Sequence, residues 1–409
     1  MDFDDTPEEA AFRSEARAWL AEHAEPITDA TPRRSPWGGG DEAGHIRRSK
    51  AWQRTLYDGG WAGITWPKQY GGRGASAVES AIFAQEQGRF DVSPGIFAVG
   101  IGMVGPTLIG HGTPGQKERY LDTMLRGDEV WCQLFSEPGA GSDLAGLGTR
   151  AIRDGDEWVV NGQKVWNSGA HYSDWGILLA RTDPSQPKHR GITYFVVDMR
   201  TPGIDVRPLR QITGQAHFNE VFLTDVRIPV ENVVGDVNDG WRVAQTTLTN
   251  ERTLIGGGAG SGWRDLATLA RETGAGSDAR LRQDLAAAFT RYELTRFLGY
   301  RVQTALSQGR TPGPESSVMK LFHSQNLART GDLVLAMQGA SATLGGVDAP
   351  KDGYWLSFFL NQWASRIGGG TDQVQRNIIG ERVLGLPKEP SVDRDMPFSE
   401  LGGRTAGRS

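Results

Sequence analysis

Apolar residues recur at helical spacing along the first third of the chain, which predicts an N-terminal α-helical domain over residues 1–130. Thr6, Pro7 and Glu9 form a capping-box sequence with proline at the first helical position. A helix is therefore expected to begin after Thr6 and to run to His23. The stretch 26–44, rich in Pro and Gly, is expected to be a surface loop. Further helices are predicted over residues 46–58, 77–88, 95–111 and 115–125.

The pattern changes after Trp131, where short β-branched and aromatic runs are separated by Gly, Pro, Asn and Asp. Such runs are typical of an antiparallel sheet or barrel, and they predict a middle β domain over residues 131–235. Asn161-Gly162 is expected to form the tight turn of a hairpin. Strands are predicted over residues 157–160, 163–166, 175–181, 193–198, 204–209 and 221–228.

Helical spacing returns from Val243 to Leu384 and predicts a C-terminal helical domain over residues 236–390. Its clearest helices are expected over residues 281–308, 316–344 and 374–384. The polar, Pro-rich tail 391–409 is expected to lie on the surface or to be mobile. The order of helices, strands and helices predicts an α+β fold.

Composition excludes several classes of function. The net charge of -5 with scattered Lys and Arg gives no basic patch for nucleic acid. The acidic first residues differ from a targeting segment and predict a cytoplasmic protein. The most apolar stretch, 95–110, is too short and too rich in glycine to span a membrane. A single cysteine, Cys132, excludes an internal disulfide and a thiolate metal cluster. No metal-binding residues are predicted.

Two segments combine the features that a flat, phosphorylated ring requires. The first is 131–143, WCQLFSEPGAGSD, and the second is 164–169, KVWNSG. They supply small hydroxyls, an aromatic plane and glycines where phosphate can approach the backbone. Neither is a P-loop, and no strand–GxGxxG–helix unit surrounds them. The first segment alone would be interpreted as a glycine-rich surface loop, but the combination predicts a flavin-binding site.

Four motifs in the same order resemble the acyl-CoA dehydrogenase family over nearly the whole chain. They are YGG at 70–72, SEPGAGSD at 136–143, NGxKxW at 161–166 and GTxxxQRNIIxERxLGLP at 370–387. The resemblance implies a fold with an N-terminal helical domain, a middle β-barrel or sheet domain and a C-terminal four-helix bundle. It also implies FAD as cofactor and the α,β-dehydrogenation of an acyl-CoA thioester.

The resemblance further assigns individual residues to the flavin. Phe135 and Ser136 are expected at the pyrimidine edge, Trp166 against the ring, and Ser168 at flavin N5. A hydroxyl at N5 would stabilise the charge that arrives with hydride. Ser142 is expected near the pyrophosphate and the CoA moiety. The residues implied to reach FAD from the C-terminal domain are Gln338, Thr371 and Gln373.

The position of the catalytic base departs from many relatives. Where they carry a Glu immediately before Gly-Thr, this chain has Gly369, which cannot accept a proton. Other relatives carry the base in a Glu-Arg pair after the sheet domain, and Glu251-Arg252 stands at that place. Adjacent charges more often mark a solvated helix face, yet the family plan favours Glu251 as the base. The Gly369 backbone N–H would still polarise the thioester carbonyl. Thr249 and Arg252 would contact CoA or orient the helix.

Other departures concern the subunits and the acyl group. The Arg-x-Gln-Phe-Gly motif that reaches a neighbouring subunit's FAD is absent from the matching stretch, 270–277. This resembles the subgroup that acts on bulky acyl-CoAs such as sterol side chains, often as heterotetramers. Glycines at positions 95, 100 and 102 and between 256 and 262 would leave space for a branched or polycyclic acyl group. A loop or a close helix contact explains the same glycines equally well.

The leading hypothesis is therefore an FAD-dependent acyl-CoA dehydrogenase, a homo- or hetero-oligomer that passes electrons to an electron-transfer flavoprotein. One alternative is a non-catalytic or half-site subunit that completes the site of a paralogous chain. Another is a flavin oxidase or monooxygenase on the same fold. The sequence does not identify the acyl group, nor whether CoA or a carrier protein delivers it.

Overall fold

A computed structural model of the chain describes residues 5–28, 31, 41–93, 95–256, 262–308, 313, 315–390 and 393–401. These residues fall into two compact units that interleave along the sequence. The first unit combines Met1–Glu42, Ala75–Ser93 and Arg252–Pro387. The second unit combines Ala43–Gly74, Pro94–Glu251 and Lys388–Ser409. The division into the sequence domains 1–130, 131–235 and 236–390 stays a prediction.

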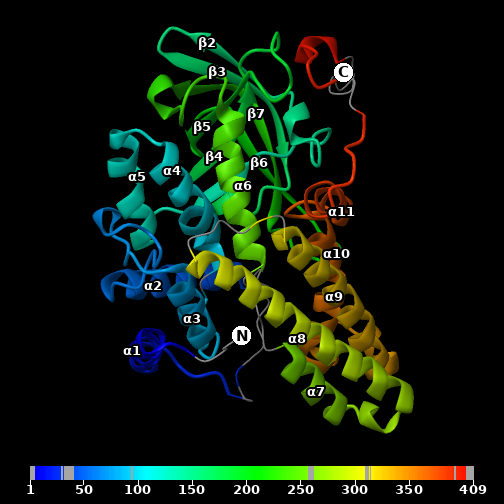
Figure 1. Cartoon of the computed structure of the whole chain (residues 1–409). Coiled ribbons are helices and arrows are strands. Elements are labelled where there is room, and N and C mark those ends of the chain that lie inside the picture. Colours follow the sequence, from blue (N-terminus) through cyan, green and yellow to red (C-terminus); the bar gives the residue numbers. More distant parts are fainter. Residues whose placement is uncertain are drawn as a thin grey trace. The chain divides into compact units, whose positions relative to one another are not determined.

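The first unit consists of helices (Figure 1). Its N-terminal helix forms as the sequence predicts, because the Thr6 hydroxyl accepts from Glu9 N at 3.2 Å and the Glu9 carboxylate accepts from Thr6 N at 2.9 Å. A buried apolar cluster, which includes Leu266, Leu333 and Trp355, holds the C-terminal helices together. The helices are α1 (Pro7–His23), α3 (Ala77–Gln87), α7 (Gly262–Glu272), α8 (Ala279–Ser307), α9 (Glu315–Gln338), α10 (Tyr354–Ile367) and α11 (Asp372–Ile378).

The second unit contains α2 (Glu42–Asp58), α4 (Gly105–His111), α5 (Pro114–Arg126) and most of α6 (Gly240–Gly256). The helix predicted over 95–111 is present, but it is not a regular α-helix throughout. This stretch is a 3₁₀ turn (Gly95–Phe97), a π-helical turn (Gly100–Val104) and α4. The indole N–H of Trp66 donates to Ile101 O at 3.1 Å, and an inserted side chain of this kind disturbs regular helical hydrogen bonding.

Substitution by alanine is expected to have opposite effects on stability at two glycines of α4. A Cβ at Gly105 would overlap the Trp66 ring, whereas a Cβ at Gly110 would meet nothing within 4 Å. We expect Gly105→Ala to lower the free energy of unfolding by about 1–3 kcal/mol through overpacking. Gly110→Ala should raise it by roughly 0.5–1 kcal/mol because alanine favours the helix. Denaturant unfolding checks both variants, and equal effects would contradict the packing seen here.

A seven-stranded sheet forms the rest of the second unit, with strand order β1-β4-β2-β3-β7-β6 and with β5 paired to β4. β1 and β2 each run parallel to β4, and the other pairs are antiparallel as predicted. The strands are β1 (Trp131–Leu134), β2 (Arg150–Asp154), β3 (Glu157–Val165), β4 (Trp175–Arg181), β5 (Ile192–Asp198), β6 (Ile204–Leu209) and β7 (Phe218–Pro229).

The hairpin turn predicted at Asn161-Gly162 is wrong, because both residues lie inside β3. The pairing of β3 with β7 shifts register there, so the pair marks a β-bulge. Asn161 satisfies this irregularity by binding Asp225 of β7 through its side chain, with distances of 2.9 and 3.0 Å. A Cβ at Gly162 would collide with Thr149. The chain instead turns at Gly155, whose φ is +62°.

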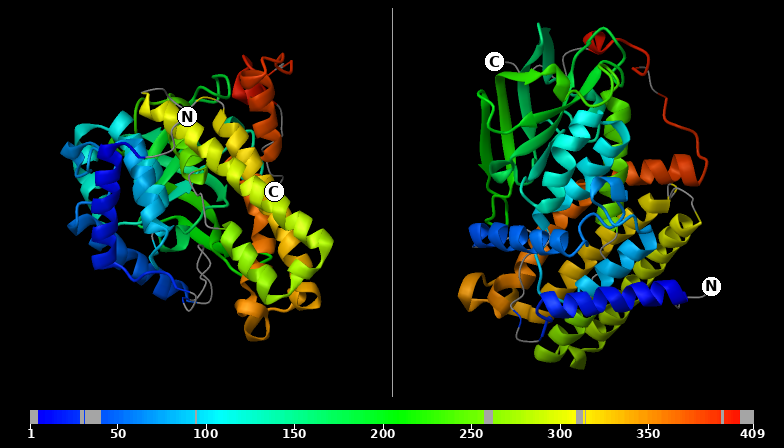
Figure 2. Two further views of the ribbon diagram at one scale, coloured as in Figure 1. Left: turned by 60° about the horizontal axis from the view of Figure 1, so that its bottom comes forward. Right: turned by 90° about the vertical axis from the view of Figure 1, so that its left-hand side faces the viewer.

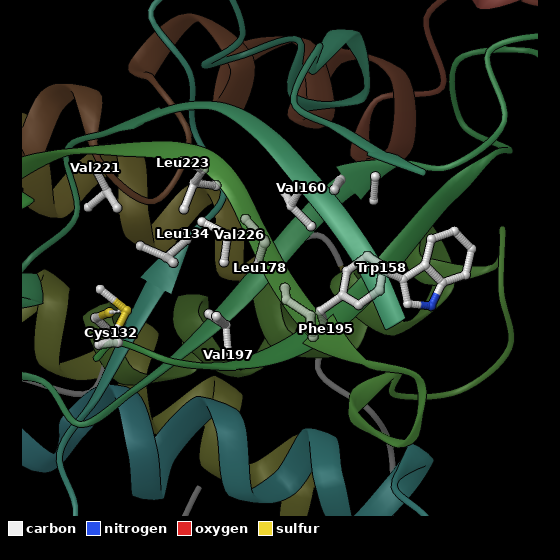
Figure 3. Close-up of a cluster of buried hydrophobic side chains, with 14 of the residues drawn as sticks. Cys132, Leu134, Trp158, Val160, Leu178, Phe195, Val197, Val221, Leu223 and Val226 are labelled. Carbon is white, nitrogen blue, oxygen red and sulfur yellow. Dashed lines mark hydrogen bonds between the residues drawn. The ribbon is translucent and has the colours of Figure 1, made fainter. Parts of the chain in front are cut away.

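One face of this sheet packs around the apolar cluster of Figure 3, in which Trp158 and Phe195 meet edge to face. Cys132 belongs to this cluster and is fully buried, and burial raises the pKa of its thiol to about 12. It is therefore the buried apolar residue that the sequence predicts rather than a redox centre.

The end of the chain returns to the sheet unit, where Figure 2 shows it in red beside the strands. Phe398 N donates to Gln186 O at 2.8 Å, and the Arg181 guanidinium lies 3.9 Å from the Phe398 ring centroid. Lys188 also forms an ion pair with Asp393 at 2.8 Å. The described part of the tail, 393–401, is therefore bound to the surface. Among the described residues, no helix is both long and apolar enough to cross a membrane.

Candidate active site

The two segments proposed as a flavin site lie side by side in the second unit. The SEPGAGSD segment leaves the sheet after β1 and folds into a turn in which Glu137 and Ala140 exchange backbone hydrogen bonds of 3.1 and 3.0 Å. Val165 N, at the end of β3, donates to Ser136 O at 2.9 Å. This bond joins the segment to the KVWNSG segment. Ser142 is exposed at the end of the turn, and Ser136 is half-buried.

A buried ion pair, which sequence reasoning missed, holds the two segments together. The Lys164 ammonium is fully buried and donates to Glu137 at 2.8 Å and to Phe135 O at 3.0 Å. Glu137 also accepts from Gly148 N at 2.7 Å and from Thr149 N at 2.9 Å. Burial alone raises the pKa of Glu137, but Lys164 and these donors outweigh it, so the pKa lies below its usual value. Both residues lie in family motifs, but they are far apart in sequence, so no local pattern predicts that they form an ion pair.

Trp166 combines high exposure with an uncommon backbone conformation. Its φ is +64°, in the left-handed region that bulky residues rarely adopt, and the residue is 61% exposed. The ring contacts Phe218 edge to face, with a centroid distance of 6.0 Å. A strained, exposed indole stabilises the fold little, and such strain is typical of functional sites. Trp166 therefore has the geometry of a binding surface.

The Asn167–Gly169 turn is fixed by several hydrogen bonds to the start of β7 and to His217, the residue before it. Asn167 N donates to Asn219 O at 3.1 Å, and Asn219 Nδ2 returns a bond to Asn167 O at 2.8 Å. Gly169 N donates to His217 O at 2.8 Å. Ser168, between them, is half-buried. The turn thus holds the backbone of Ser168, and Asn219 is a supporting residue with no signal in the sequence.

A buried cluster of hydroxyls anchors α6 within the second unit. Thr247 of α6 lies 2.9 Å from Thr107 of α4 and 3.2 Å from the Tyr194 hydroxyl of β5, oxygen to oxygen. Burial raises the pKa of Tyr194, which keeps the phenol neutral. The Phe135 ring, which is buried, packs edge to face on Tyr194 at 5.8 Å. The cluster therefore connects Phe135, which precedes the SEPGAGSD segment, to α6, the helix that carries Glu251.

Glu251 lies one helical turn after Thr247 and is half-buried. The Thr249 hydroxyl, on the same helix, donates to Gln245 O at 2.8 Å. Arg252 belongs to α6, but its side chain lies outside the described part of the chain. Of the predicted site, the second unit thus holds the flavin segments and Glu251.

The first unit holds the predicted residues of the C-terminal motif. Gly369 and Gly370 have φ values of +63° and +86°, which favour glycine. The Thr371 hydroxyl caps α11 by accepting from Val374 N at 3.1 Å, and Gln373 is exposed. Gln338 ends α9, where its side-chain amide donates to Val334 O at 3.0 Å. The motif therefore forms a glycine turn followed by a capped helix.

Two of the glycines predicted to widen an acyl pocket lie close to other side chains. A Cβ at Gly100 would lie 3.3 Å from both Met124 and Trp131, and one at Gly262 would lie 2.7 Å from the Tyr292 hydroxyl. These two glycines permit close packing, which favours a close helix contact at these positions over added pocket space. Gly257, Gly258 and Gly260 lie outside the described residues.

Comparison with known families covers almost the whole chain. Residues 6–128 match the model of the acyl-CoA dehydrogenase N-terminal domain. Residues 132–226 match the model of the middle domain, and residues 238–384 match the model of the C-terminal domain.

Individual relatives and solved structures agree with these matches. The chain is 38% identical to the acyl-CoA dehydrogenase IpdE1 of Mycobacterium tuberculosis, over 92% of this chain and 98% of that protein. The structure of the Tcur3481-Tcur3483 steroid ACAD is 31% identical, has a TM-score of 0.83 and covers 95% of this chain and 100% of its own. The ChsE4-ChsE5 complex from M. tuberculosis is 29% identical, with a TM-score of 0.78 and coverages of 95% and 100%.

Proposed function

This chain belongs to the acyl-CoA dehydrogenase family, and on this premise we propose that it oxidises a bulky acyl-CoA to the α,β-unsaturated thioester. Members of the family are FAD-dependent oxidoreductases of lipid metabolism, and FAD is the cofactor. When bound, FAD supplies the acceptor for the hydride that leaves the β-carbon. The observation that carries the proposal is the exposed Trp166 indole, held in a strained conformation beside the Ser136 segment.

The residues present fit a flavin. An indole with an exposed face can cover the ring and exclude water, and the turn before Ser142 offers glycine backbone and a hydroxyl to phosphate. Ser136 and Phe135 would hold the polar edge of the ring, and Ser168 would donate to N5. Lys164 and Glu137 support these residues from beneath, because their ion pair fixes both segments. Gln338, Thr371 and Gln373, which the family resemblance also assigns to FAD, belong to the first unit.

Glu251 is the proposed base. Its carboxylate takes the α-proton, and the electron pair of the broken C–H bond forms the α,β double bond as hydride leaves the β-carbon. The Gly369 N–H stabilises the negative charge on the thioester oxygen, since a backbone donor needs no side chain. Thr249 and Arg252 would contact the CoA moiety or orient α6. The tie between Thr247 and Tyr194 supports this proposal, because it fixes the helix one turn before the base.

The proposed substrate is a branched or polycyclic acyl-CoA. This is supported by the likeness to a structure described as a steroid ACAD and by the absence of the Arg-x-Gln-Phe-Gly motif. The proposed assembly is a homo- or hetero-oligomer, in line with the ChsE4-ChsE5 complex among similar structures. An electron-transfer flavoprotein is the proposed electron acceptor.

Anaerobic flavin bleaching by a panel of thioesters tests the proposal. We expect the purified chain to be yellow and to lose its flavin absorbance with branched or polycyclic acyl-CoAs. A clear preference for straight short-chain acyl-CoA would contradict the substrate class. Flavin binding only with a second, paralogous chain would favour a partner subunit, and stoichiometric peroxide on turnover in air would favour an oxidase.

Trp166 permits a test of the flavin site that does not require turnover. Glycine tolerates a φ of +64°, so Trp166→Gly should change the unfolding free energy of flavin-free protein by less than about 1 kcal/mol, because relief of strain offsets added chain entropy. Loss of the indole should weaken FAD binding roughly five- to tenfold in Kd. Fluorescence titration with FAD checks the second effect.

Trp166→Ala is the matched control for this variant. It also lacks the indole, so its FAD affinity should fall equally, but it retains the strain and should be about 1 kcal/mol less stable than Trp166→Gly. Unchanged FAD affinity in both variants would show that the indole does not contact the flavin.

A further inference from the structure

The turn that carries Gly369 is held from inside the first unit by a buried charge cluster. Asp372, the first residue of α11, is almost fully buried and accepts from Ser324 Oγ at 2.6 Å. The Lys320 ammonium lies 3.4 Å from the same carboxylate, and so does Arg366 Nε. Lys320 is also buried, and burial lowers its pKa although Asp372 opposes this effect. The cluster therefore fixes the start of α11 to α9.

Gln375 reaches back from α11 to the turn itself. Its side-chain amide donates to Gly369 O at 3.1 Å and contacts Gly370 O at 3.4 Å. A Cβ at Gly370 would lie 2.6 Å from the same amide nitrogen, so the glycine there makes the close approach possible. These carbonyls belong to the peptide planes 369–370 and 370–371, which directly follow the Gly369 N–H. The contacts with Gln375 therefore restrict rotation of the turn on that side.

The Gln375 amide adds little net stability, which argues for a role beyond folding. Gln375 is 1% exposed, and its Oε1 has no hydrogen-bond partner among the described residues. A buried acceptor without a partner is destabilising, and an apolar side chain of similar size would avoid this cost. The two bonds to the turn therefore explain why this position carries an amide rather than an apolar side chain.

We propose that Gln375 and Asp372 are positioning residues of the reaction, which fix turn 368–371 so that the Gly369 N–H meets the thioester carbonyl. The proposal rests on the proposed function of the Gly369 N–H. Gln375 acts on the turn directly, and Asp372 acts by anchoring the helix from which Gln375 projects. Neither residue needs to touch the substrate.

Three variants of the FAD-loaded enzyme test the proposal. They are Gln375→Leu, Asp372→Asn and, as a control, Asp284→Asn, which removes a surface carboxylate of α8 in the same unit. The first readout is hydrogen–deuterium exchange of peptides covering the turn in the resting enzyme. We expect faster exchange there in the first two variants and wild-type exchange in the control.

The second readout is catalytic. We expect Gln375→Leu to lower kcat about 10- to 100-fold with KM nearly unchanged, because misplacement of a donor affects the transition state. Isotope-edited infrared spectra should show a smaller shift of the bound thioester carbonyl. The melting temperature should change little, since removal of the unpaired oxygen offsets the lost bonds.

Two outcomes overturn the proposal. One is unchanged exchange of the turn in both variants, and the other is faster exchange with wild-type kcat and carbonyl frequency. A wild-type enzyme that no thioester bleaches would overturn the proposed function and the catalytic half of this inference together. The exchange data, which need no substrate, would still decide whether Gln375 and Asp372 fix the turn.

Discussion

Glu251→Gln is expected to abolish bleaching of the flavin by acyl-CoA, with a loss of roughly 10²–10⁴-fold in the rate of reduction. Glutamine has nearly the same shape and hydrogen-bonding reach as glutamate but cannot take the α-proton. The position offers a half-buried side chain on a helix whose preceding turn is anchored by Thr247. Anaerobic stopped-flow absorbance with the best thioester of the panel measures the loss.

The control for this variant is Glu231→Gln, which removes an exposed carboxylate elsewhere in the second unit. It should bleach at the wild-type rate. FAD content and thioester binding of Glu251→Gln should also stay at wild-type levels, so that the loss is confined to chemistry. A Glu251→Gln enzyme that bleaches normally would move the base to another residue, while a colourless one would assign Glu251 a structural role.

Lys164→Met is expected to lower the free energy of unfolding by about 3–5 kcal/mol. The substitution keeps an unbranched side chain of similar length but leaves Glu137 buried without its counter-charge. The lost ammonium also leaves Phe135 O without the donor at 3.0 Å, at the start of the flavin segment. We therefore expect reduced FAD retention as well. Denaturant unfolding and the flavin-to-protein absorbance ratio measure the two effects.

The double variant Lys164→Met/Glu137→Gln separates charge from packing. A neutral amide can still accept from Gly148 N or Thr149 N, so the double variant should recover much of the stability lost in Lys164→Met. A cost below about 1 kcal/mol for Lys164→Met alone would contradict a buried ion pair.

The same pair predicts a dependence on pH. The folded-state pKa of Glu137 lies below the unfolded value of about 4.3, so its contribution is present above that pH and is lost as pH falls through the folded pKa. Wild-type stability should therefore fall in acid, with a steeper slope than in the double variant, which has no carboxylate there. Unfolding midpoints between pH 3 and 6, about the range set by these values, check the sign.

The sequence predicted individual elements well where neighbours along the chain decide them. β4 and β6 have the predicted bounds, and the Thr6 capping box opens α1 as expected. Local chemistry suffices in these cases, because caps, alternation and turn residues act within a few positions. The family motifs likewise gave the family and the cofactor, which three domain models and the relatives support.

Local signals failed where a distant partner competes with them. Asn161-Gly162 is a strong turn sequence, but bonds from Asn161 to Asp225 make it a bulge. Within the helix predicted over 95–111, the Trp66 indole bonds Ile101 O in a π-helical turn that the sequence did not predict. Both partners are far away in sequence, so no window of ten residues contains the information.

The sequence by itself determined the order of elements, the family motifs with their proposed flavin residues, and the missing carboxylate at Gly369. Only the tertiary structure decided how those residues are held. Contacts made on folding decide three features of the site. They are the strained φ of Trp166, the ion pair of Lys164 with Glu137, and the hydrogen bond from Gln375 to Gly369 O. The physical reason is that the energy of an ion pair or a hydrogen bond depends on its burial. Burial and backbone strain are both set by the packing of the whole chain rather than by any single residue.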